Sequence, residues 1–206
     1  MLRALRLAGI VVACSALLLA SCGSPESSPD EDQTTDAGSA TALVDLDDAG
    51  AVAGWTTVND PVMGGRSTSR VAFGDGGLVF SGTISLENNG GFASARSPEN
   101  PEIGQRATGA QSLSVRARGD GKTYLLKVGI GGQPWSYIQR FATEANVEQT
   151  YELPVEDFEP VGMRLDPAPD APQTLDPSTI DQVAIYILDK QQGPFEITVY
   201  AIGARP

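Results

Sequence analysis

The segment Trp55–Ser67 contains the side chains that are best placed to recognise a ligand. Pro61 has a fixed φ, and the pair Gly64-Gly65 permits sharply turned or left-handed backbone, so the segment forms a tightly specified loop. On one interpretation its polar side chains form a recognition surface. On the other, Asp60 hydrogen-bonds nearby turn backbone and Trp55 closes the end of the fold. The candidate binding residues of this loop are Trp55, Asn59, Asp60, Arg66 and Ser67.

Two further candidate binding residues lie outside this loop. Arg96 follows the small residues 93–95 in an expected strand, and its planar guanidinium suits a buried carboxylate or a ligand oxygen. Asp120 lies between two glycines in an expected turn. We therefore hypothesise that Arg96 pairs with the carboxylate of Asp60 or of Asp120.

Catalytic chemistry is poorly supported by the composition. The chain has no histidine, which excludes Ser-His-Asp triads and His-ligated zinc. Its two cysteines, Cys14 and Cys22, both precede the part expected to fold, so thiol catalysis and disulfides are excluded there. Paired carboxylates can hydrolyse glycosides, but no pair stands out among the many acids. We expect a protein that is not an enzyme.

No cofactor is predicted either. Asp and Asn oxygens in loops suit calcium, so a structural calcium ion is kept as the alternative, although the compact Asp-x-Asp-x-Asp spacing is missing. The formal net charge of −12 excludes nucleic-acid binding through clustered Lys and Arg. It also disfavours anionic lipid headgroups, so attachment to a membrane would depend on a covalent lipid.

Alternation of apolar and polar residues with a period of two predicts many short strands separated by turns, and therefore an all-β sandwich or barrel. The alternation is clearest in 78–86, 113–118, 124–130, 183–187 and 195–201. Asn88–Gly91 and Gly119–Gly121 read as β-hairpin turns, and the proline-rich Val161–Pro177 reads as an exposed loop. Trp135 and Tyr137 share one parity, which suits a sugar-stacking platform or, more commonly, the core.

The N-terminus resembles a bacterial lipoprotein. Residues 1–21 form an expected signal peptide, with a basic start and a short apolar run that ends at the lipobox-like Leu19-Ala20-Ser21-Cys22. That resemblance implies cleavage before Cys22 and acylation of Cys22. Residues 22–42 are polar and acidic, which predicts a lipid-anchored disordered linker. Residues 43–206 are then one β-sandwich domain, tethered to the extracytoplasmic face of a membrane in the cell envelope.

Four segments in their order along the chain resemble the complex I intermediate-associated protein 30 family: Trp55–Ser67, Asn88–Arg96, Arg118–Tyr124 and Asp189–Glu196. The resemblance covers about Val44 to Ala204. It implies a galactose-binding-like jelly-roll β-sandwich in a single domain, without established enzymatic activity. The mitochondrial members assist assembly of NADH:ubiquinone oxidoreductase on the matrix side, whereas this chain is expected outside the cytoplasm.

We therefore expect a non-catalytic, membrane-tethered binding or assembly module that engages a protein partner, with a membrane complex as one option. The alternative is a carbohydrate-binding module for cell-envelope glycan. The two differ in the surface that they need: a sugar binder needs a groove with exposed aromatic rings, whereas an assembly module needs an apolar or mixed patch.

Overall fold

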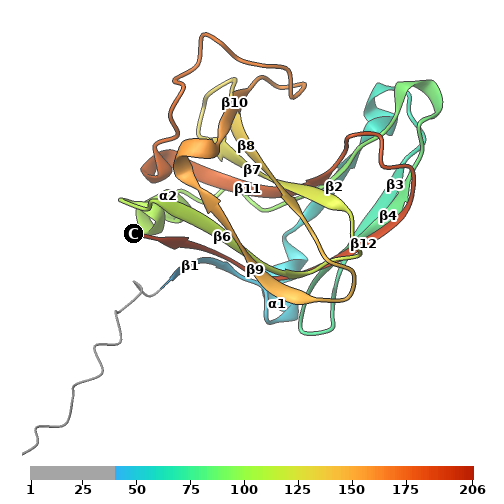
Figure 1. Ribbon diagram of the computed structural model, residues 1–206, viewed down its shortest axis with the longest axis horizontal. Helices are drawn as coiled ribbons and strands as arrows, with labels where there is room; N and C mark the ends of the chain where they lie inside the picture. Colours follow the sequence, from blue (N-terminus) through green and yellow to red (C-terminus); the bar gives the residue numbers. More distant parts are fainter. Residues whose placement is uncertain (1–39) are drawn as a thin grey trace, which may run out of the picture. The chain divides into compact units, whose positions relative to one another are not determined.

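The computed structural model describes residues 40–206, which fold into two six-stranded antiparallel sheets packed face to face (Figure 1). The predicted all-β jelly-roll sandwich is confirmed. The expected signal peptide, Cys22 and most of the expected linker lie outside the described residues, so their assignments stay predictions.

Sheet A has the strand order β3-β4-β12-β6-β9, and β1 pairs with the C-terminal half of β12. The long strand β12 is central because β4 pairs with its first half and β6 with its second half. The bounds of these strands are β1 Thr41–Asp45, β3 Thr68–Gly74, β4 Gly77–Ile84, β6 Ser112–Arg118, β9 Glu148–Pro154 and β12 Gly193–Arg205.

Sheet B has the strand order β10-β8-β7-β11-β5-β2. Its central strands β7 and β11 are long, whereas β10 and β2 form short edges. The bounds are β2 Thr56–Asn59, β5 Ala93–Arg96, β7 Thr123–Ile130, β8 Ser136–Ala142, β10 Glu159–Val161 and β11 Ile180–Ile187.

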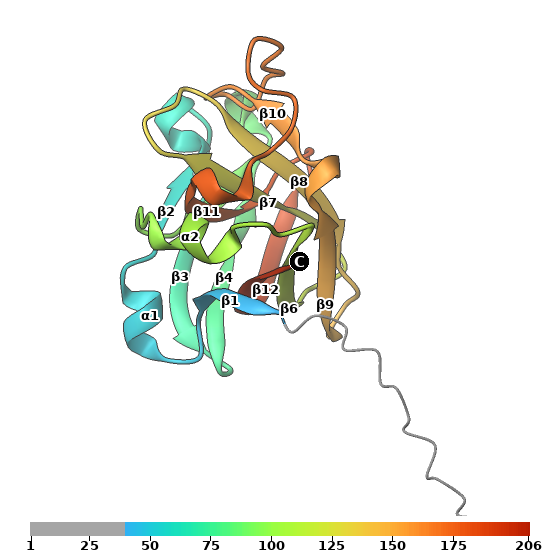
Figure 2. The same cartoon turned by 90° about the vertical axis from the view of Figure 1, so that its left-hand side faces the viewer.

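Helices are short and serve as connections. Figure 2 shows α2 at the open end of the sandwich, where it contacts β11 of sheet B and both β1 and β12 of sheet A. The α-helices are α1 Ala49–Ala53 and α2 Glu102–Ala107, and the 3-10 helices are η1 Asp60–Met63, η2 Glu87–Asn89, η3 Val155–Asp157 and η4 Pro177–Thr179. Within residues 40–206, none of the helices has the length and apolar composition needed to cross a bilayer.

The core lies between the sheets and is filled by the alternating residues, as predicted. Val115, Leu126 and Ile185 are fully buried there. The prediction fails at Ala201, because the pairing of β12 with β6 shifts register between Val199 and Ala201. The shift brings Ile202 into the core in place of Ala201, which is half-exposed.

Two turns that read as hairpins are crossovers between the sheets. Asn88–Gly91 connects β4 in sheet A to β5 in sheet B, and Gly119–Gly121 connects β6 in sheet A to β7 in sheet B. The glycines and asparagines mark sharp changes of chain direction in both cases. Local turn chemistry does not fix which sheet receives the next strand, and in a sandwich the next strand often lies across the core.

Sheet B is covered on both faces, which is unusual for an antiparallel sandwich sheet. Its outer face carries a second apolar cluster, to which Leu125 contributes from β7 and Tyr186 from β11. Leu165, from the segment between β10 and η4, packs on this cluster. The expected exposed loop Val161–Pro177 is therefore only partly exposed, and Leu175 within it is buried in the main core.

Candidate functional site

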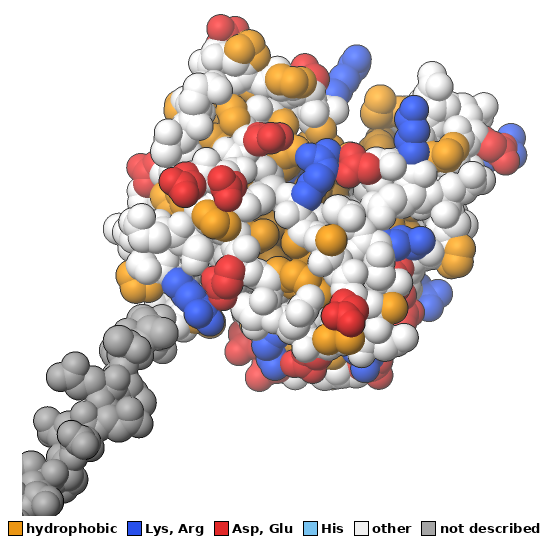
Figure 3. Space-filling model, in the orientation of Figure 1, with side chains coloured by type: hydrophobic (Ala, Val, Ile, Leu, Met, Phe, Trp, Pro, Cys, Tyr) orange, Lys and Arg blue, Asp and Glu red, His pale blue; other side chains and the backbone are white. Residues whose placement is uncertain are grey.

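A groove of about 400 Å³ lies over the outer face of sheet B, and we call it the sheet B groove. One wall is formed by η1 and the segment Asn89–Phe92, and the opposite wall by Met163–Leu165. Tyr186 and Arg96 line the floor, and Leu188–Lys190 lines one end. Figure 3 shows the hollow between the projection around β10 and the projection around β2 and β3.

Asp60 ties together the two segments of the first wall. It is 1 % exposed, and its Oδ1 accepts a hydrogen bond from the backbone N–H of Ser67 at 2.7 Å. Its Oδ2 accepts from the backbone N–H groups of Gly91 (2.6 Å) and Phe92 (3.3 Å), and from the Ser67 hydroxyl. The carboxylate therefore replaces missing backbone pairing in two loops, which is a structural role.

Glycines make room for this carboxylate. A Cβ at Gly65 would lie 2.4 Å from the carboxyl carbon of Asp60, and a Cβ at Gly90 would lie 2.7 Å from its Oδ2. Gly64 has a φ of 92°, in the left-handed region that side chains disfavour. The pair Gly64-Gly65 therefore lets the chain turn sharply and also lets the backbone approach the Asp60 carboxylate closely.

The protonation of Asp60 reflects the same contacts. Burial raises the pKa of the Asp60 carboxyl, but the hydrogen bonds from Ser67, Gly91 and Phe92 together outweigh burial and lower this pKa below its usual range. Asp60 is therefore ionised at neutral pH, and its acceptor positions are directed at these donors.

Arg96 binds an aromatic hydroxyl rather than a carboxylate. Its Nε donates to the Ser94 hydroxyl at 3.2 Å and its Nη2 donates to the Tyr186 hydroxyl at 2.7 Å. The hypothesis that Arg96 pairs with Asp60 or Asp120 is wrong. The oxygens of Asp60 are occupied by Ser67 and the opposite loop, and Asp120 lies elsewhere.

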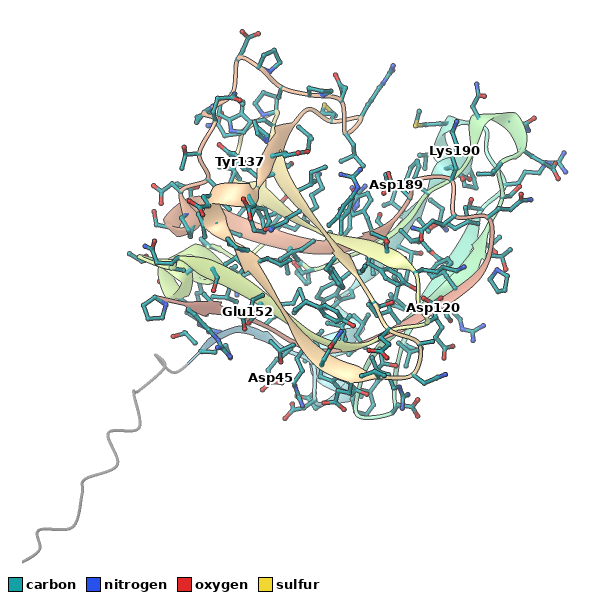
Figure 4. All side chains as sticks on the ribbon, in the orientation of Figure 1. Asp45, Asp120, Tyr137, Glu152, Asp189 and Lys190 are labelled. Atoms are coloured by element: carbon teal, nitrogen blue, oxygen red, sulfur yellow. The ribbon has the colours of Figure 1, made fainter. Side chains whose placement is uncertain are left out.

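Asp120 stabilises the corner at which the chain passes from sheet A to sheet B. Its carboxylate accepts from the Lys122 N–H (3.1 Å), the Tyr124 hydroxyl (3.1 Å) and the Glu196 N–H (3.0 Å). Figure 4 shows Asp120 apart from Asp189, which is labelled beside the groove. Its three partners come from the β6–β7 connection, β7 and β12, so Asp120 fixes the sheets to one another.

Lys127 is a second cation on the outer face of sheet B. The pairing register aligns Lys127 of β7 and Arg96 of β5 with the same residue of β11, Ala184. The Lys127 Nζ lies 5.9 Å from the centre of the Tyr186 ring, and the Arg96 guanidinium carbon lies 5.5 Å from it. Burial first, and the nearby charge of Arg96 second, lower the pKa of Lys127 to about 8.

The charged groups on the neighbouring strands leave these two cations unneutralised. Arg140 of β8 binds Asp189 through two hydrogen bonds of 2.8 and 3.0 Å. Glu159 of the edge strand β10 is exposed and is separated from Lys127 by the intervening strand β8. The six ion pairs within residues 40–206 involve neither Arg96 nor Lys127.

Two further cations, at the wall and at the end of the groove, also take part in no ion pair within residues 40–206. Arg164 and Lys190 line the groove, and neither forms an ion pair with another residue in the described range 40–206. Figure 4 labels Lys190 beside Asp189 at the edge of the groove. A chain with a formal net charge of −12 therefore presents a locally cationic groove.

The rim of the groove is apolar and exposed. Met63 on one wall is 63 % exposed, and Met163 on the opposite wall is 86 % exposed. Val62, beside Met63, is 71 % exposed. By contrast, the Tyr186 side chain is 3 % exposed, so its ring is no open stacking platform.

The candidate residues from the sequence divide between groove, core and other surface. Only Asp60 and Arg96 line the groove. Trp55 is 5 % exposed in the core, so it cannot contribute to an exposed binding surface. Asn59 hydrogen-bonds Ser69 at 2.6 Å, Arg66 forms an exposed ion pair with Glu87 at 3.3 Å, and Ser67 is fully buried against Asp60.

Sequence reasoning did not identify the other groove residues. They lie on strand positions of the outer face or in connections: Met63, Met163, Arg164, Tyr186 and Lys190. Lys127, which contacts Tyr186 beside the groove, was not identified either. One signal was available, because Leu125 breaks the alternation of β7 and indicates that its outer face is also covered. Tyr137 does not form a platform, since it is 3 % exposed and its hydroxyl donates to the Pro172 carbonyl at 2.9 Å.

No metal centre emerges from the part of the chain that the structure describes. Residues 40–206 contain no group of three or more Cys, Asp or Glu side chains arranged to hold an ion. The carboxylates beside the groove are engaged instead, Asp60 with four donors and Asp189 with Arg140.

Comparison with known proteins gives one family and one fold. The family model of complex I intermediate-associated protein 30 matches residues 44–199. No curated protein matches the sequence. Among solved structures, the family 11 carbohydrate-binding module of the cellulosomal cellulase Lic26A-Cel5E of Clostridium thermocellum is 15 % identical with a TM-score of 0.57, and the alignment covers 82 % of this chain and 95 % of that one.

Two further solved structures are similar. A family 11 module from Clostridium thermocellum in complex with a β-1,3-1,4-mixed-linked tetrasaccharide is 18 % identical with a TM-score of 0.54, over 81 % of this chain and 97 % of that chain. The agarase AgWH50C is 11 % identical with a TM-score of 0.51, over 81 % of this chain and 26 % of that chain. At such identities the similarity shows a shared fold alone.

Proposed function

Because the chain belongs to the complex I intermediate-associated protein 30 family, we propose that it is a non-catalytic binding module that engages a protein partner in an assembly or scaffolding role. The contact surface in this proposal is the sheet B groove with its apolar rim.

The exposure of Met63 and Met163 on opposite walls is the observation that carries this proposal. Methionine is flexible and polarizable, and it is used at adaptable protein-binding surfaces. Exposed apolar side chains that are grouped around a groove and flanked by charges are typical of interaction sites rather than of inert surface. An aromatic platform for a sugar ring would require an exposed face, which Tyr186 does not offer.

The carboxylates at the groove support a non-catalytic role. Asp60 is held by four hydrogen bonds, and Asp189 by two from Arg140. A general acid or base must be able to exchange a proton with a substrate, and a carboxylate that is saturated by fixed donors is poorly suited to this.

We also propose, from the sequence alone, that the module is attached through a lipid on Cys22 to the extracytoplasmic face of a cell-envelope membrane. A tethered module would meet membrane proteins at high effective concentration. A membrane complex is therefore the class of partner that we would test first.

The test is capture of partners from detergent-solubilised membranes with the lipidated protein, followed by mass spectrometry. The variant Met63→Gln/Met163→Gln replaces the exposed methionine on each wall of the groove, so it should fold normally and lose the partner. Phe73→Gln is the matched control, because Phe73 is an exposed apolar residue of β3 that does not line the groove. Equal capture by the rim variant and the control would refute the groove as the contact surface.

Binding of cell-envelope glycan is the second candidate function. It is favoured by the shared fold with the two family 11 carbohydrate-binding modules and by the concave shape of the groove. Purified cell-envelope glycan serves as a parallel bait. Retention on glycan without any captured protein would replace the protein-partner proposal by this one.

A further inference from the structure

The outer face of sheet B brings together two cations that have no anionic partner within residues 40–206: Arg96, which lines the groove, and Lys127, which lies beside it against Tyr186. We propose that Arg96 and Lys127 form a binding position for a carboxylate, and that this carboxylate belongs to a segment of the protein partner in which acidic and apolar residues alternate. The inference rests on the proposed function for the nature of the partner, and it adds the chemistry of recognition.

The register of sheet B creates this position. Arg96 of β5 and Lys127 of β7 align with Ala184 of β11 from its two sides, so their Cα atoms are about 10 Å apart, two strand spacings. The side chain between them is a single methyl group. Both cations approach the ring of Tyr186, at 5.5 and 5.9 Å from its centre. An anion between the two side chains would contact both.

Arg96 is positioned but not saturated. Its Nε donates to Ser94 and its Nη2 to Tyr186, which uses two of the five N–H donors of a guanidinium. Within residues 40–206, the other donors have no protein acceptor in the hydrogen-bond pattern. Two fixed contacts orient the planar group while leaving donors for a carboxylate, which it can bind through two parallel hydrogen bonds.

The ammonium group of Lys127 is the cation that a bound anion would stabilise more. It is half-buried, and among residues 40–206 its ammonium group has neither an ion pair nor a hydrogen bond to a side chain. A charge in such surroundings is poorly solvated, which agrees with the lowered pKa of Lys127. A bound carboxylate would restore favourable interactions of this ammonium.

The cations of the groove favour an acidic ligand, and its apolar rim favours a peptide with apolar side chains. Arg164 and Lys190 extend the positive surface along the groove. The two carboxylates that line the groove are already engaged, Asp60 by fixed donors and Asp189 by Arg140, and acidic groups farther than about 8 Å are screened at physiological salt. Met63, Met163 and Leu165 line the same groove as Arg96, Arg164 and Lys190, and apolar side chains of a peptide would pack on them.

Fluorescence anisotropy of a labelled ten-residue peptide of alternating Glu and Leu, titrated with the full chain at pH 7, tests this inference. A peptide of alternating Gln and Leu serves as the uncharged comparator. Arg96→Gln and Lys127→Met should each weaken binding of the Glu–Leu peptide at least tenfold, or about 1.4 kcal/mol. The Gln–Leu peptide should bind weakly to all forms.

Matched controls exclude a general effect of net charge. Arg70→Gln and Lys122→Met make the same two substitutions outside the groove, at cations that also lack an ion pair within residues 40–206. They should change affinity less than twofold. Equal losses in the Arg96 and Lys127 variants and in these controls, or equal binding of the two peptides, would overturn the inference.

The test does not depend on Arg96→Gln alone. Lys127→Met removes a poorly solvated charge and should fold at least as well as wild type, so the inference can still be tested if Arg96→Gln fails to fold. An oligogalacturonate of ten units that binds more tightly than the Glu–Leu peptide, with the same dependence on Arg96 and Lys127, would assign the position to an acidic glycan and overturn the peptide.

This inference and the proposed function fail separately. If membrane capture is lost in Met63→Gln/Met163→Gln but kept in Arg96→Gln, the protein partner stands and the carboxylate position is wrong. If no partner is captured while Arg96 still governs binding of the Glu–Leu peptide, the position stands and the proposed assembly role fails.

Discussion

Replacement of Asp60 by Asn tests whether its carboxylate holds the first wall of the groove together. The amide keeps the shape of the side chain but places an NH₂ donor where one oxygen accepted hydrogen bonds. If the remaining oxygen stays with the Ser67 N–H at 2.7 Å, the Gly91 N–H loses its acceptor, which lies at 2.6 Å in the wild type.

The expected cost follows from these contacts. Hydrogen bonds to charged groups contribute about 1.5–3 kcal/mol, and a buried N–H without an acceptor costs about 1–3 kcal/mol. Asp60 is 1 % exposed and Gly91 is partly buried, so we take a value within these ranges. We expect Asp60→Asn to lower the free energy of unfolding by about 3 kcal/mol. For a domain of this size, the thermal midpoint should fall by roughly 6–12 °C.

Urea denaturation followed by tryptophan fluorescence measures this change, because Trp55 is buried in the core. Asp48→Asn is the control: the Asp48 carboxylate accepts from the N–H groups of Gly50 and Ala51 at the exposed N-terminus of α1. Asn caps helices about as well as Asp, so this variant should stay within about 0.5 kcal/mol of wild type. A loss in Asp60→Asn no larger than in the control would refute the structural role of Asp60.

The pH dependence of stability separates the contribution of the Asp60 charge from that of packing. Hydrogen bonds outweigh burial and hold the pKa of Asp60 below its usual range, so the folded carboxylate takes up its proton at lower pH than in the unfolded chain. The stabilisation is therefore complete above about pH 4, the pKa of an unfolded Asp, and is lost as pH falls through the lower folded pKa. The difference in stability between wild type and Asp60→Asn should shrink below pH 4. A constant difference from pH 6 to pH 3 would show that packing, and not charge, is responsible.

Three more predictions concern the groove and its loops. Gly65→Ala should destabilise the fold by about 1–3 kcal/mol, because the new Cβ would lie 2.4 Å from the Asp60 carboxyl carbon. The control Gly132→Ala meets open space and should cost only about 1 kcal/mol, for its left-handed backbone. Equal losses of the two variants in urea titrations would contradict this reasoning. Lys190→Gly should raise the thermal midpoint by roughly 2–4 °C, since Lys190 has a left-handed φ of 57°, and an unchanged midpoint would show that this turn is not strained. Burial lowers the pKa of Lys127 to about 8, so the unfolded chain holds an extra proton between about pH 8 and 10.5; the stability of wild type relative to Lys127→Met should rise across this window, and a flat difference would contradict the lowered pKa.

The elements that sequence reasoning identified are those in which local pattern and final burial agree. The alternation around Val115, Leu126 and Ile185 predicted inward faces, and these side chains are fully buried. The prediction failed at Ala201, where a register shift in the pairing with β6 reverses the faces. Such a shift depends on the partner strand and leaves little trace in the alternation of a single strand.

The loops show a similar division. The sequence marked Asp60 and its glycines as a specified turn, and one of the two interpretations gave Asp60 a structural role. The structure shows that role with different partners, because Gly91 and Phe92 lie 31 and 32 residues further along the chain. Turn chemistry is local, so it indicated where the chain bends but not what the bend approaches.

Composition and periodicity alone determined much about this protein. They indicated a β-sandwich or barrel, excluded histidine chemistry and, in the part expected to fold, thiol chemistry, and gave an acidic chain, since each of these depends on residue type or on neighbours along the chain. Only the tertiary structure decided that Lys127, Ala184 and Arg96 lie in one row across three strands. That row is a product of strand order and register, which are fixed by packing between distant segments. The cationic groove of an acidic protein therefore exists only once the sheet has formed.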